Sequence, residues 1–412
     1  MLIGSDSTMP SLLDAADAFS KLGEKSVKIN EAACVCVRHR NATCHACLQV
    51  CPHEAITIER NTLAVDQHLC TGCGACASVC PTEALRLAED PNETVRALID
   101  AAEPNSTINV CCKHVSEQLA EHEQDPDRSL LQPSANEPIA AVRCLASLDE
   151  SSLIHGACAG IALHYHSADC AQCPEGHGIL IEDIIEQARS FTDALPLASQ
   201  THFDETLDRF RWTVQGEPAA KQPRDTSPEM SRRGMFDHLI ARTTDSVAEA
   251  AVGTFYVSKH SSDEKPTLAQ NLMEAQGVMK TVTVERSAQV LDDLYRMDPA
   301  HAEDPAFAQD ETVLPTRLFG EITLDTTRCD LCGICMTFCP TRALTGIASE
   351  PTNPFVALTR SVEVTGELSF RANDCVACQL CVDICPQKAL DLALGIKTCD
   401  LFALEPRLLL KK

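Results

Sequence analysis

Apolar and polar residues alternate in short segments near both ends of the chain, which is the pattern of half-buried β-strands. Residues 55–60 (AITIER) and 63–67 (LAVDQ) alternate in this way and predict a hairpin. Residues 321–325 (EITLD) and 367–374 (ELSFRAND) repeat the pattern, and the Pro- and Gly-containing residues 345–366 predict a loop between them. Both ends are therefore expected to contain small antiparallel β-structures.

The middle of the chain alternates strands with helices. Apolar segments that predict strands lie at residues 108–112, 139–144 and 161–166. Residues 151–159 have helical character, and residues 179–191 (ILIEDIIEQARSF) have the period of an amphipathic helix. Such alternation favours a small α/β domain with parallel strands. After it, the Pro-rich residues 216–231 predict a linker and residues 236–296 a mainly helical segment.

Cysteines are concentrated beside the terminal strands, in four runs that end in Cys-Pro and share a short tail: CPHEAI, CPTEAL, CPTRAL and CPQKAL. Three runs have the spacing C-x2-C-x2-C-x3-C-P, which in bacterial ferredoxins binds 4Fe–4S clusters. These three runs are Cys70, Cys73, Cys76 and Cys80; Cys329, Cys332, Cys335 and Cys339; and Cys375, Cys378, Cys381 and Cys385. A zinc ribbon is disfavoured, because zinc ribbons use pairs of cysteines rather than triplets with a trailing Cys-Pro.

The first run departs from this spacing. It keeps Cys44, Cys47 and Cys51, but Asn41 stands where a fourth cysteine is expected. Cys36 could supply the missing thiolate and needs the shorter excursion of the chain, while Cys34 is the alternative. If neither binds, a three-ligand 3Fe–4S centre would result.

Both ends of the chain resemble the bacterial two-cluster 4Fe–4S ferredoxins, in which the two runs exchange their last ligand. The resemblance implies two clusters at each end. At the N-terminal end the implied ligand sets are Cys36, Cys44, Cys47 with Cys80, and Cys70, Cys73, Cys76 with Cys51. At the C-terminal end they are Cys329, Cys332, Cys335 with Cys385, and Cys375, Cys378, Cys381 with Cys339.

Cysteines in the middle suggest a fifth site. Residues 139–178 resemble the delta subunit of methyl-viologen-reducing hydrogenase, a family with a 2Fe–2S cluster that passes electrons between hydrogenase and heterodisulfide reductase. Strand ends at one edge of a parallel sheet would bring together Cys111 or Cys112 with Cys144, Cys170 and Cys173. Zinc at Cys170 and Cys173, with His166 or His177, is an alternative, as are reduced thiols without a function. Cys158 is expected in the core, and Cys399 has no assigned role.

The expected fold is therefore α+β, with two ferredoxin-like two-cluster units flanking a small α/β domain with parallel strands. The ferredoxin units are predicted at residues 27–90 and 318–395, and the α/β domain at residues 105–215. Residues 216–317 are predicted to be a linker and a helical segment.

Composition narrows the class of protein. The 412 residues carry 24 cysteines and a formal charge of −25, which disfavours binding to nucleic acid. The N-terminus lacks a secretory signal, and no segment reaches the roughly 18 apolar residues of a membrane span, so a cytoplasmic protein is predicted. The acidic charge would suit a basic surface on a redox partner, or it could simply maintain solubility.

The sequence thus predicts a polyferredoxin that relays single electrons and has no catalytic residue of its own. The expected partner is a catalytic oxidoreductase such as a formate dehydrogenase, a hydrogenase or a heterodisulfide-reductase-like complex. An assembly factor for a metalloenzyme and a redox sensor are the alternatives.

Overall fold

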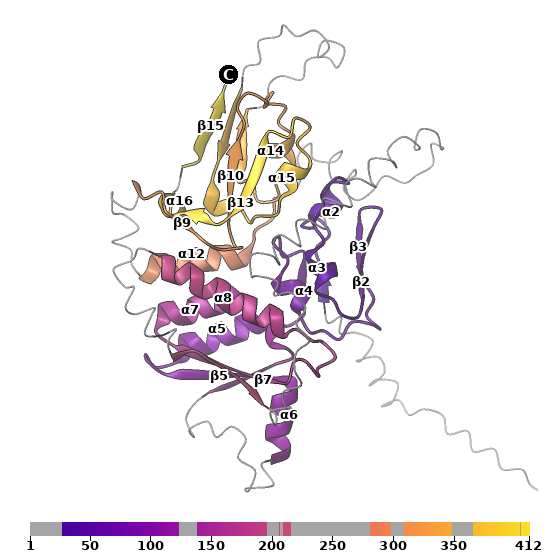
Figure 1. Cartoon of the computed structure of the whole chain (residues 1–412), viewed down its shortest axis with the longest axis vertical. Coiled ribbons are helices and arrows are strands. Elements are labelled where there is room, and N and C mark those ends of the chain that lie inside the picture. The colour runs from indigo at the N-terminus through magenta and orange to yellow at the C-terminus, as the bar shows by residue number, and fades with distance from the viewer. Residues whose placement is uncertain are drawn as a thin grey trace, which may run out of the picture.

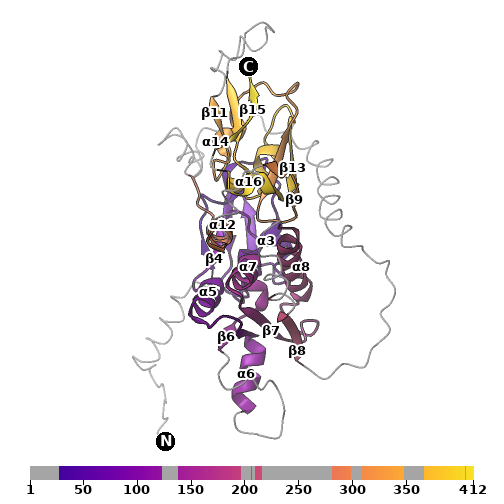
Figure 2. The same ribbon diagram turned by 90° about the vertical axis from the view of Figure 1, so that its left-hand side faces the viewer.

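The computed structural model describes residues 27–122, 138–195, 206, 209–215, 281–297, 309–347, 366–403 and 405–412. A parallel four-stranded sheet lies in the middle of the sequence, and short antiparallel sheets lie toward both ends. We call residues 27–88 the N-terminal lobe, and the described part of residues 309–412 the C-terminal lobe. The central lobe comprises the described part of residues 90–297. Figures 1 and 2 show an elongated arrangement with the central lobe at one end and the C-terminal strands at the other.

The N-terminal lobe consists of two antiparallel strand pairs with short helices between them. Strand β1 (Val27–Ile29) pairs with β4 (Leu85–Leu87), and β2 (Ile56–Glu59) pairs with β3 (Thr62–Val65), which confirms the predicted hairpin. The three short helices are α2 (Val35–Arg38), α3 (Ala46–Gln49) and α4 (Ala75–Ser78). The chain therefore returns to its first strand after passing both cysteine runs.

The C-terminal lobe repeats this plan with additions. Strand β10 (Gly320–Leu324) pairs with β13 (Leu390–Leu394), and β11 (Leu344–Ile347) pairs with β12 (Glu367–Phe370). Strand β15 (Arg407–Lys411) extends the second sheet by pairing with β12. The remaining elements are β9 (Val313–Leu314), β14 (Ile396–Lys397), α14 (Ile334–Phe338), η3 (Ala372–Asp374), α15 (Leu380–Asp383) and α16 (Thr398–Leu401).

Strands β10 and β12 of the C-terminal lobe were predicted from the sequence, whereas β11 lies where a loop was predicted. The predicted strands at residues 321–325 and 367–374 correspond to β10 and β12. The predicted loop at residues 345–366 was wrong at its start, because residues 345–347 pair with β12 as part of β11. Residues 348–365 of that predicted loop lie outside the described residues.

The central lobe contains the predicted parallel sheet. Its strands are β5 (Thr107–Cys112), β6 (Ile139–Val142), β7 (Ala162–Ala168) and β8 (Arg211–Gln215), in the order β6-β5-β7-β8. All neighbouring strands are parallel. The inner strand β5 is buried over most of its length, as expected for a strand covered on both faces. Strand β8 was not predicted.

Helices cover both faces of this sheet. Figure 1 shows α5 (Pro91–Ala101), α7 (Glu150–Ala159) and α8 (Gly178–Ala194) on one side and α6 (Lys113–His122) on the other. The predicted helices at residues 151–159 and 179–191 are confirmed as α7 and α8, while α5 and α6 were not predicted. Helix α5 begins with Pro91 after the N-cap Asp90, whose carboxylate accepts a hydrogen bond from the Asn92 amide. The turn η1 (Leu145–Ser147) follows β6.

Helix α12 (Glu285–Met297) lies at the end of the predicted helical segment and packs against α7. Residues 216–280, which include the predicted linker and most of that segment, are not described. Asp293 on α12 accepts two hydrogen bonds of 3.0 Å from Arg96 on α5. It also lies 2.9 Å from Nδ1 of His155 on α7. This buried ion group therefore fixes three helices to one another.

Apolar packing joins the lobes. One buried cluster extends from the central lobe into the C-terminal lobe, and a second contains the N-terminal core together with Leu380 and Ile384 of the C-terminal lobe. None of the helices in the described ranges has the length and apolar character needed to cross a membrane. The lobes are thus parts of one packed body.

Asp293→Ala is expected to destabilise the protein by about 3 kcal/mol, because it removes the buried carboxylate that Arg96 and His155 share and leaves His155 with Asp100 alone. Asp292→Ala is the matched control, since Asp292 is an exposed carboxylate on the same helix that pairs with Arg296; its cost should stay below about 1 kcal/mol. Anaerobic thermal unfolding followed by circular dichroism measures both. Equal losses for the two variants would contradict this account.

The contribution of Asp293 to the free energy of unfolding should also depend on pH. Although burial acts in the opposite direction, the His155 and Arg96 hydrogen bonds hold the pKa of the Asp293 carboxyl below its ordinary value. A carboxyl with a lowered folded-state pKa contributes stability above its unfolded pKa of about 3.9, and this stability is lost as the pH falls toward the folded value. Asp293→Ala should therefore lose less stability on acidification than the parent chain.

Candidate iron–sulfur site

Each cysteine run folds as a tight turn followed by one turn of helix. In three runs the residue before the short helix has a left-handed backbone, with φ of 82° at Gly74, 76° at Gly333 and 62° at Gln379. Glycine takes this conformation without strain, which explains the glycines at two of these positions. The turn places the third cysteine of each of these three runs, namely Cys76, Cys335 and Cys381, within a short helix.

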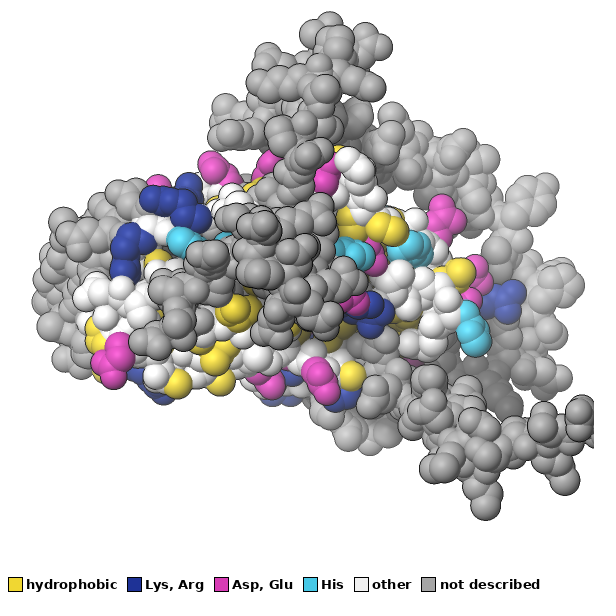
Figure 3. All heavy atoms as spheres, turned by 90° about the horizontal axis from the view of Figure 1, so that it is seen from below, with side chains coloured by type: hydrophobic (Ala, Val, Ile, Leu, Met, Phe, Trp, Pro, Cys, Tyr) yellow, Lys and Arg dark blue, Asp and Glu magenta, His cyan; other side chains and the backbone are white. Residues whose placement is uncertain are grey.

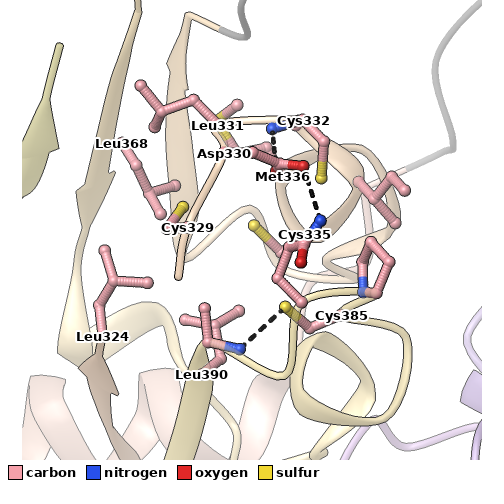
Figure 4. Close-up of a pocket in the computed structure, with 15 residues that line it drawn as sticks. Leu324, Cys329, Asp330, Leu331, Cys332, Cys335, Met336, Leu368, Cys385 and Leu390 are labelled. Carbon is pink, nitrogen blue, oxygen red and sulfur yellow. Dashed lines mark hydrogen bonds between the residues drawn. The ribbon is translucent and has the colours of Figure 1, made fainter. Parts of the chain in front are cut away.

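Four cysteines of the C-terminal lobe line one cavity of about 410 Å³ that is partly open to solvent. These are Cys329, Cys332, Cys335 and Cys385. Figure 4 shows their sulfurs directed toward a common space, with Leu324, Leu368 and Leu390 around it. Burial, and then the neighbouring Cys332, Cys329 and Cys385, raise the pKa of Cys335 to about 12. We call these four residues the outer C-terminal thiol group.

An equivalent cavity of about 360 Å³ lies in the N-terminal lobe. It is lined by Cys51, Cys70, Cys73 and Cys76, which we call the outer N-terminal thiol group. Apolar walls come from Val27, Ile56 and Val65. Burial, followed by the charges of Cys73, Cys70 and Cys51, raises the pKa of Cys76 to about 12. In both cavities the fourth sulfur comes from the other run of the same lobe.

The remaining ferredoxin-run cysteines form two further groups. Burial and then the charges of Cys378, Cys375 and Cys339 raise the pKa of Cys381, and we call these four residues the inner C-terminal thiol group. Burial and then Cys80, Cys44 and Cys34 raise the pKa of Cys47. The inner N-terminal thiol group is accordingly Cys44, Cys47 and Cys80 with the upstream Cys34 and Cys36.

Both upstream cysteines reach the inner N-terminal group. The Cys36 sulfur donates a hydrogen bond to the Cys44 carbonyl at 3.0 Å. The pKa of Cys36 is raised first by the hydrogen bond with Cys34, then by burial, and then by the charges of Cys34, Cys44 and Cys47. The same Cys36 hydrogen bond is the largest of the effects that lower the pKa of Cys34 to about 7. Either sulfur is thus placed to act as the fourth member of this group.

Backbone amides point at the sulfurs. The amide of Ala84 donates to the Cys80 sulfur at 3.2 Å, and that of Ala389 donates to the Cys385 sulfur at 3.3 Å. Both alanines belong to the repeated tail after Cys-Pro and are buried. Such hydrogen bonds stabilise negative charge on sulfur and are a main determinant of cluster potential. Soft thiol donors, apolar walls and inward amides together fit an iron–sulfur cubane.

The middle cysteines lie at one edge of the central sheet. Cys112 ends β5, Cys144 follows β6, and Cys170 follows β7, so the parallel strands bring all three to their carboxyl ends. Cys112 is close enough to Cys170 to raise its pKa, although burial contributes more. Burial is the largest of the effects that raise the pKa of Cys144 to about 12, and the charges of Cys73, Cys170 and Cys173 also raise it. This group therefore lies beside the outer N-terminal thiol group.

Histidines near this edge have other neighbours. The Nε2 atom of His166 lies 2.9 Å from Oδ1 of Asn109, whereas Nε2 of His177 lies 3.3 Å from the Cys73 sulfur. Within the described ranges, the residues that bring three metal-ligating atoms within 4.8 Å of one another are His114, Cys173 and Glu175. His114 and Glu175 were not predicted from the sequence, because they carry no recognisable spacing and meet only through folding.

Three cysteines stand apart from these groups. Cys158 on α7 lies against the apolar core, where burial raises its pKa. Cys399 is the second residue of α16, and its backbone amide donates a hydrogen bond to the Asp310 carbonyl. Cys111 points to the opposite side of β5 from Cys112, as the two-residue period of a strand requires. It is 1% exposed and belongs to the central core.

Comparison with known families identifies the cysteine-rich ends. Residues 42–55 and residues 63–86 each match a family described as a 4Fe-4S binding domain, and residues 321–389 match one described as a 4Fe-4S dicluster domain. The chain therefore carries 4Fe–4S ferredoxin-type domains near both ends. None of these matches includes the middle segment, so they do not show its resemblance to the hydrogenase delta subunit. No curated protein and no solved structure matches the chain significantly.

Gly74→Ala should destabilise the turn between Cys73 and Cys76. A Cβ atom there would lie 2.5 Å from the Ser147 Cβ and 2.7 Å from Leu87 Cδ1, at a φ of 82°. The expected loss is about 3 kcal/mol from strain and overlap together, measured by anaerobic thermal unfolding. Gly176→Ala is the control, since it has a φ of 61° but its Cβ would meet only the Cys173 carbonyl oxygen at 3.9 Å. A loss as large at Gly176 would refute the steric explanation.

Proposed function

We propose that the chain is an electron-transfer protein that holds four 4Fe–4S clusters and relays single electrons to or from a catalytic oxidoreductase. The observation that carries this proposal is the pair of cavities in which four sulfurs from two separate runs meet. The ferredoxin-type family matches at both ends support an iron–sulfur electron-transfer role. A cluster supplies a one-electron couple whose potential depends on its surroundings.

The proposed ligand sets follow the four thiol groups. They are Cys51, Cys70, Cys73 and Cys76; Cys36, Cys44, Cys47 and Cys80; Cys339, Cys375, Cys378 and Cys381; and Cys329, Cys332, Cys335 and Cys385. The chain's part is to orient these sulfurs, to direct amides such as those of Ala84 and Ala389 at them, and to keep water away with apolar walls. We assign no catalytic residue, since bond-making chemistry would belong to the partner.

For the middle site we propose a metal centre that uses Cys112, Cys144, Cys170 and Cys173. Support comes from the effect of Cys112 on the pKa of Cys170, from the effects of Cys170 and Cys173 on that of Cys144, and from the position of Cys112, Cys144 and Cys170 at the carboxyl edge of the sheet. A 2Fe–2S cluster is the first choice. Zinc is the alternative, and the group of His114, Cys173 and Glu175 supports a mononuclear ion at Cys173.

The partner proposed is a formate dehydrogenase, a hydrogenase or a heterodisulfide-reductase-like complex, met in the cytoplasm. The charge of −25 would suit a basic partner surface rather than nucleic acid. Figure 3 shows acidic and basic side chains both scattered over the face viewed from the central lobe's end. We therefore place electron exchange at the thiol groups themselves rather than at a charged patch on that face.

Iron and sulfide analysis of anaerobically purified protein tests the proposal. Four cubanes predict about 16 irons per chain, and a 2Fe–2S centre would raise this to about 18. Reduction should produce EPR signals of 4Fe–4S clusters that appear and disappear reversibly. Fewer than about 8 irons after anaerobic reconstitution, or stoichiometric zinc in place of iron, would refute the proposal.

Cys36→Ser is expected to remove or convert one cluster, because we assign Cys36 as the fourth ligand of the inner N-terminal group. Iron should fall from about 16 to about 12, or to about 15 with a 3Fe–4S signal in the oxidised protein. Cys34→Ser is the matched control and should keep its iron. Iron loss in Cys34→Ser with none in Cys36→Ser would reverse the assignment.

A further inference from the structure

The two ferredoxin-type domains touch each other directly. The backbone amide and the hydroxyl of Thr43 both donate to Oδ2 of Asp383, at 2.8 and 3.0 Å. Thr43 precedes Cys44 of the inner N-terminal thiol group, and Asp383 lies between Cys381 and Cys385. The contact thus joins one cysteine run of each lobe.

Packing surrounds this contact. The rings of His39 and Phe338 meet edge to face, with centroids 4.9 Å apart. Leu380 is fully buried, and both it and Ile384 belong to the same apolar cluster as the N-terminal core. Backbone segments that are far apart in the sequence are therefore fixed against one another at this place, which we call the joint.

Each lobe presents one charged side chain to the thiols of the other across the joint. Arg38, at the end of α2, is 3% exposed, and its Nε donates to the Ala32 carbonyl at 2.7 Å. Arg38 adjoins His39, whose ring contacts Phe338, and Phe338 directly precedes Cys339 of the C-terminal lobe. Consistent with this placement, burial lowers the pKa of Arg38, and the Cys339 and Cys378 charges oppose that effect. A buried cation is costly unless anions lie nearby, and the thiolates of a cluster bound at these two cysteines would be such anions.

The reciprocal charge is Asp383. Its carboxylate belongs to the C-terminal lobe, but it is among the charges that raise the pKa of Cys44 in the N-terminal lobe, after burial. Cys44 in turn acts on the pKa of Cys378, although burial and that residue's own group contribute more. The two inner thiol groups are consequently neighbours, with a positive charge at one and a negative charge at the other.

The two outer thiol groups lie on either side of the two inner groups, so that the four groups form a row. Helix α3, which carries Cys47, packs against α4, which carries Cys76 of the outer N-terminal group. In the same way α15, which carries Cys381, packs against α14, which carries Cys335 of the outer C-terminal group. The row therefore runs from the outer N-terminal group through both inner groups to the outer C-terminal group. All 24 cysteines are described, and Cys332, at the last position of the row, is the exposed one.

We propose that Arg38 and Asp383 impose a step in potential at the joint, so that electrons move more favourably from the inner N-terminal group to the inner C-terminal group. The proposal rests on the proposed function, since it needs a cluster in each group. A fixed positive charge favours the more negative, reduced state of a cluster beside it, and a negative charge disfavours that state. Arg38 thus raises the potential at Cys339 and Cys378, and Asp383 lowers the potential at Cys44.

EPR-monitored redox titration of full-length Arg38→Gln and Asp383→Asn tests this. Arg38→Gln should move one midpoint to a more negative value, and Asp383→Asn should move a different midpoint to a more positive one. We expect about a tenfold change in each reduction equilibrium, which is about 59 mV for a one-electron couple. Iron content should remain at the parent value in both variants.

Arg296→Gln and Asp292→Asn are the matched controls, because both change the charge of exposed residues on α12, which lies outside the joint. Shifts as large in the controls, shifts of the same sign in the two joint variants, or unchanged midpoints would overturn the proposal. If Arg38→Gln loses iron because Arg38 is buried, the more accessible Asp383→Asn carries the test. Iron loss from both variants would also overturn it, since the residues would then maintain structure rather than set potential.

The parent protein separates failure of this proposal from failure of the proposed function. A parent chain without cubane iron refutes the function before any variant is made. A parent chain with about 16 irons and reversible EPR signals, combined with unshifted midpoints in the variants, refutes only the step at the joint.

Discussion

Crowding of sulfur atoms in cavities with apolar walls is the constraint on which the rest of this structure depends. Burial comes first and neighbouring thiols second among the effects that raise the pKa of Cys76 and Cys335 to about 12. At neutral pH such thiols would remain protonated without metal, because four close thiolates repel one another. Metal cations bound between the thiolates would offset this repulsion. Metal binding and the final packing of the lobes are therefore expected to be thermodynamically linked.

The central lobe gives this arrangement its rigidity. It shares an apolar core with the C-terminal lobe and brings Ser147 against Gly74 of the N-terminal lobe. Two arginines add further contacts between the lobes. Arg286 on α12 donates hydrogen bonds to the carbonyls of Ser78 and Cys80 beside a cysteine run, and Arg317 forms an ion pair with Glu150 of α7. Such packing holds neighbouring thiol groups at constant separations, which electron transfer over short distances requires.

Local spacing made much of the structure predictable. The Cys-Pro runs, the hairpin at residues 55–67 and the period of residues 179–191 depend on neighbours in sequence, and each corresponds to an observed element. The carboxyl-edge position of Cys112, Cys144 and Cys170 followed from the rule that parallel strands end at one side.

Features that depend on tertiary contact were not predictable. Strand β15 is recognisable only through its pairing with β12, and β8 only through its pairing with β7. The meeting of His114, Cys173 and Glu175 has no sequence signature. Arg38 lies two positions after Cys36 in the sequence, yet its charge acts on thiols of the opposite lobe, because the joint is formed by packing.

The Thr43–Asp383 contact has a consequence for biosynthesis. Its two residues are 340 positions apart, so at about 5–20 residues per second the ribosome needs roughly 20–70 s to make the second after the first. During that interval the nascent N-terminal lobe lacks the cover that Leu380 and Ile384 later provide. Its thiols are then open to oxygen and stray metals, so cofactor delivery to this lobe must either precede completion of the chain or wait under reducing protection.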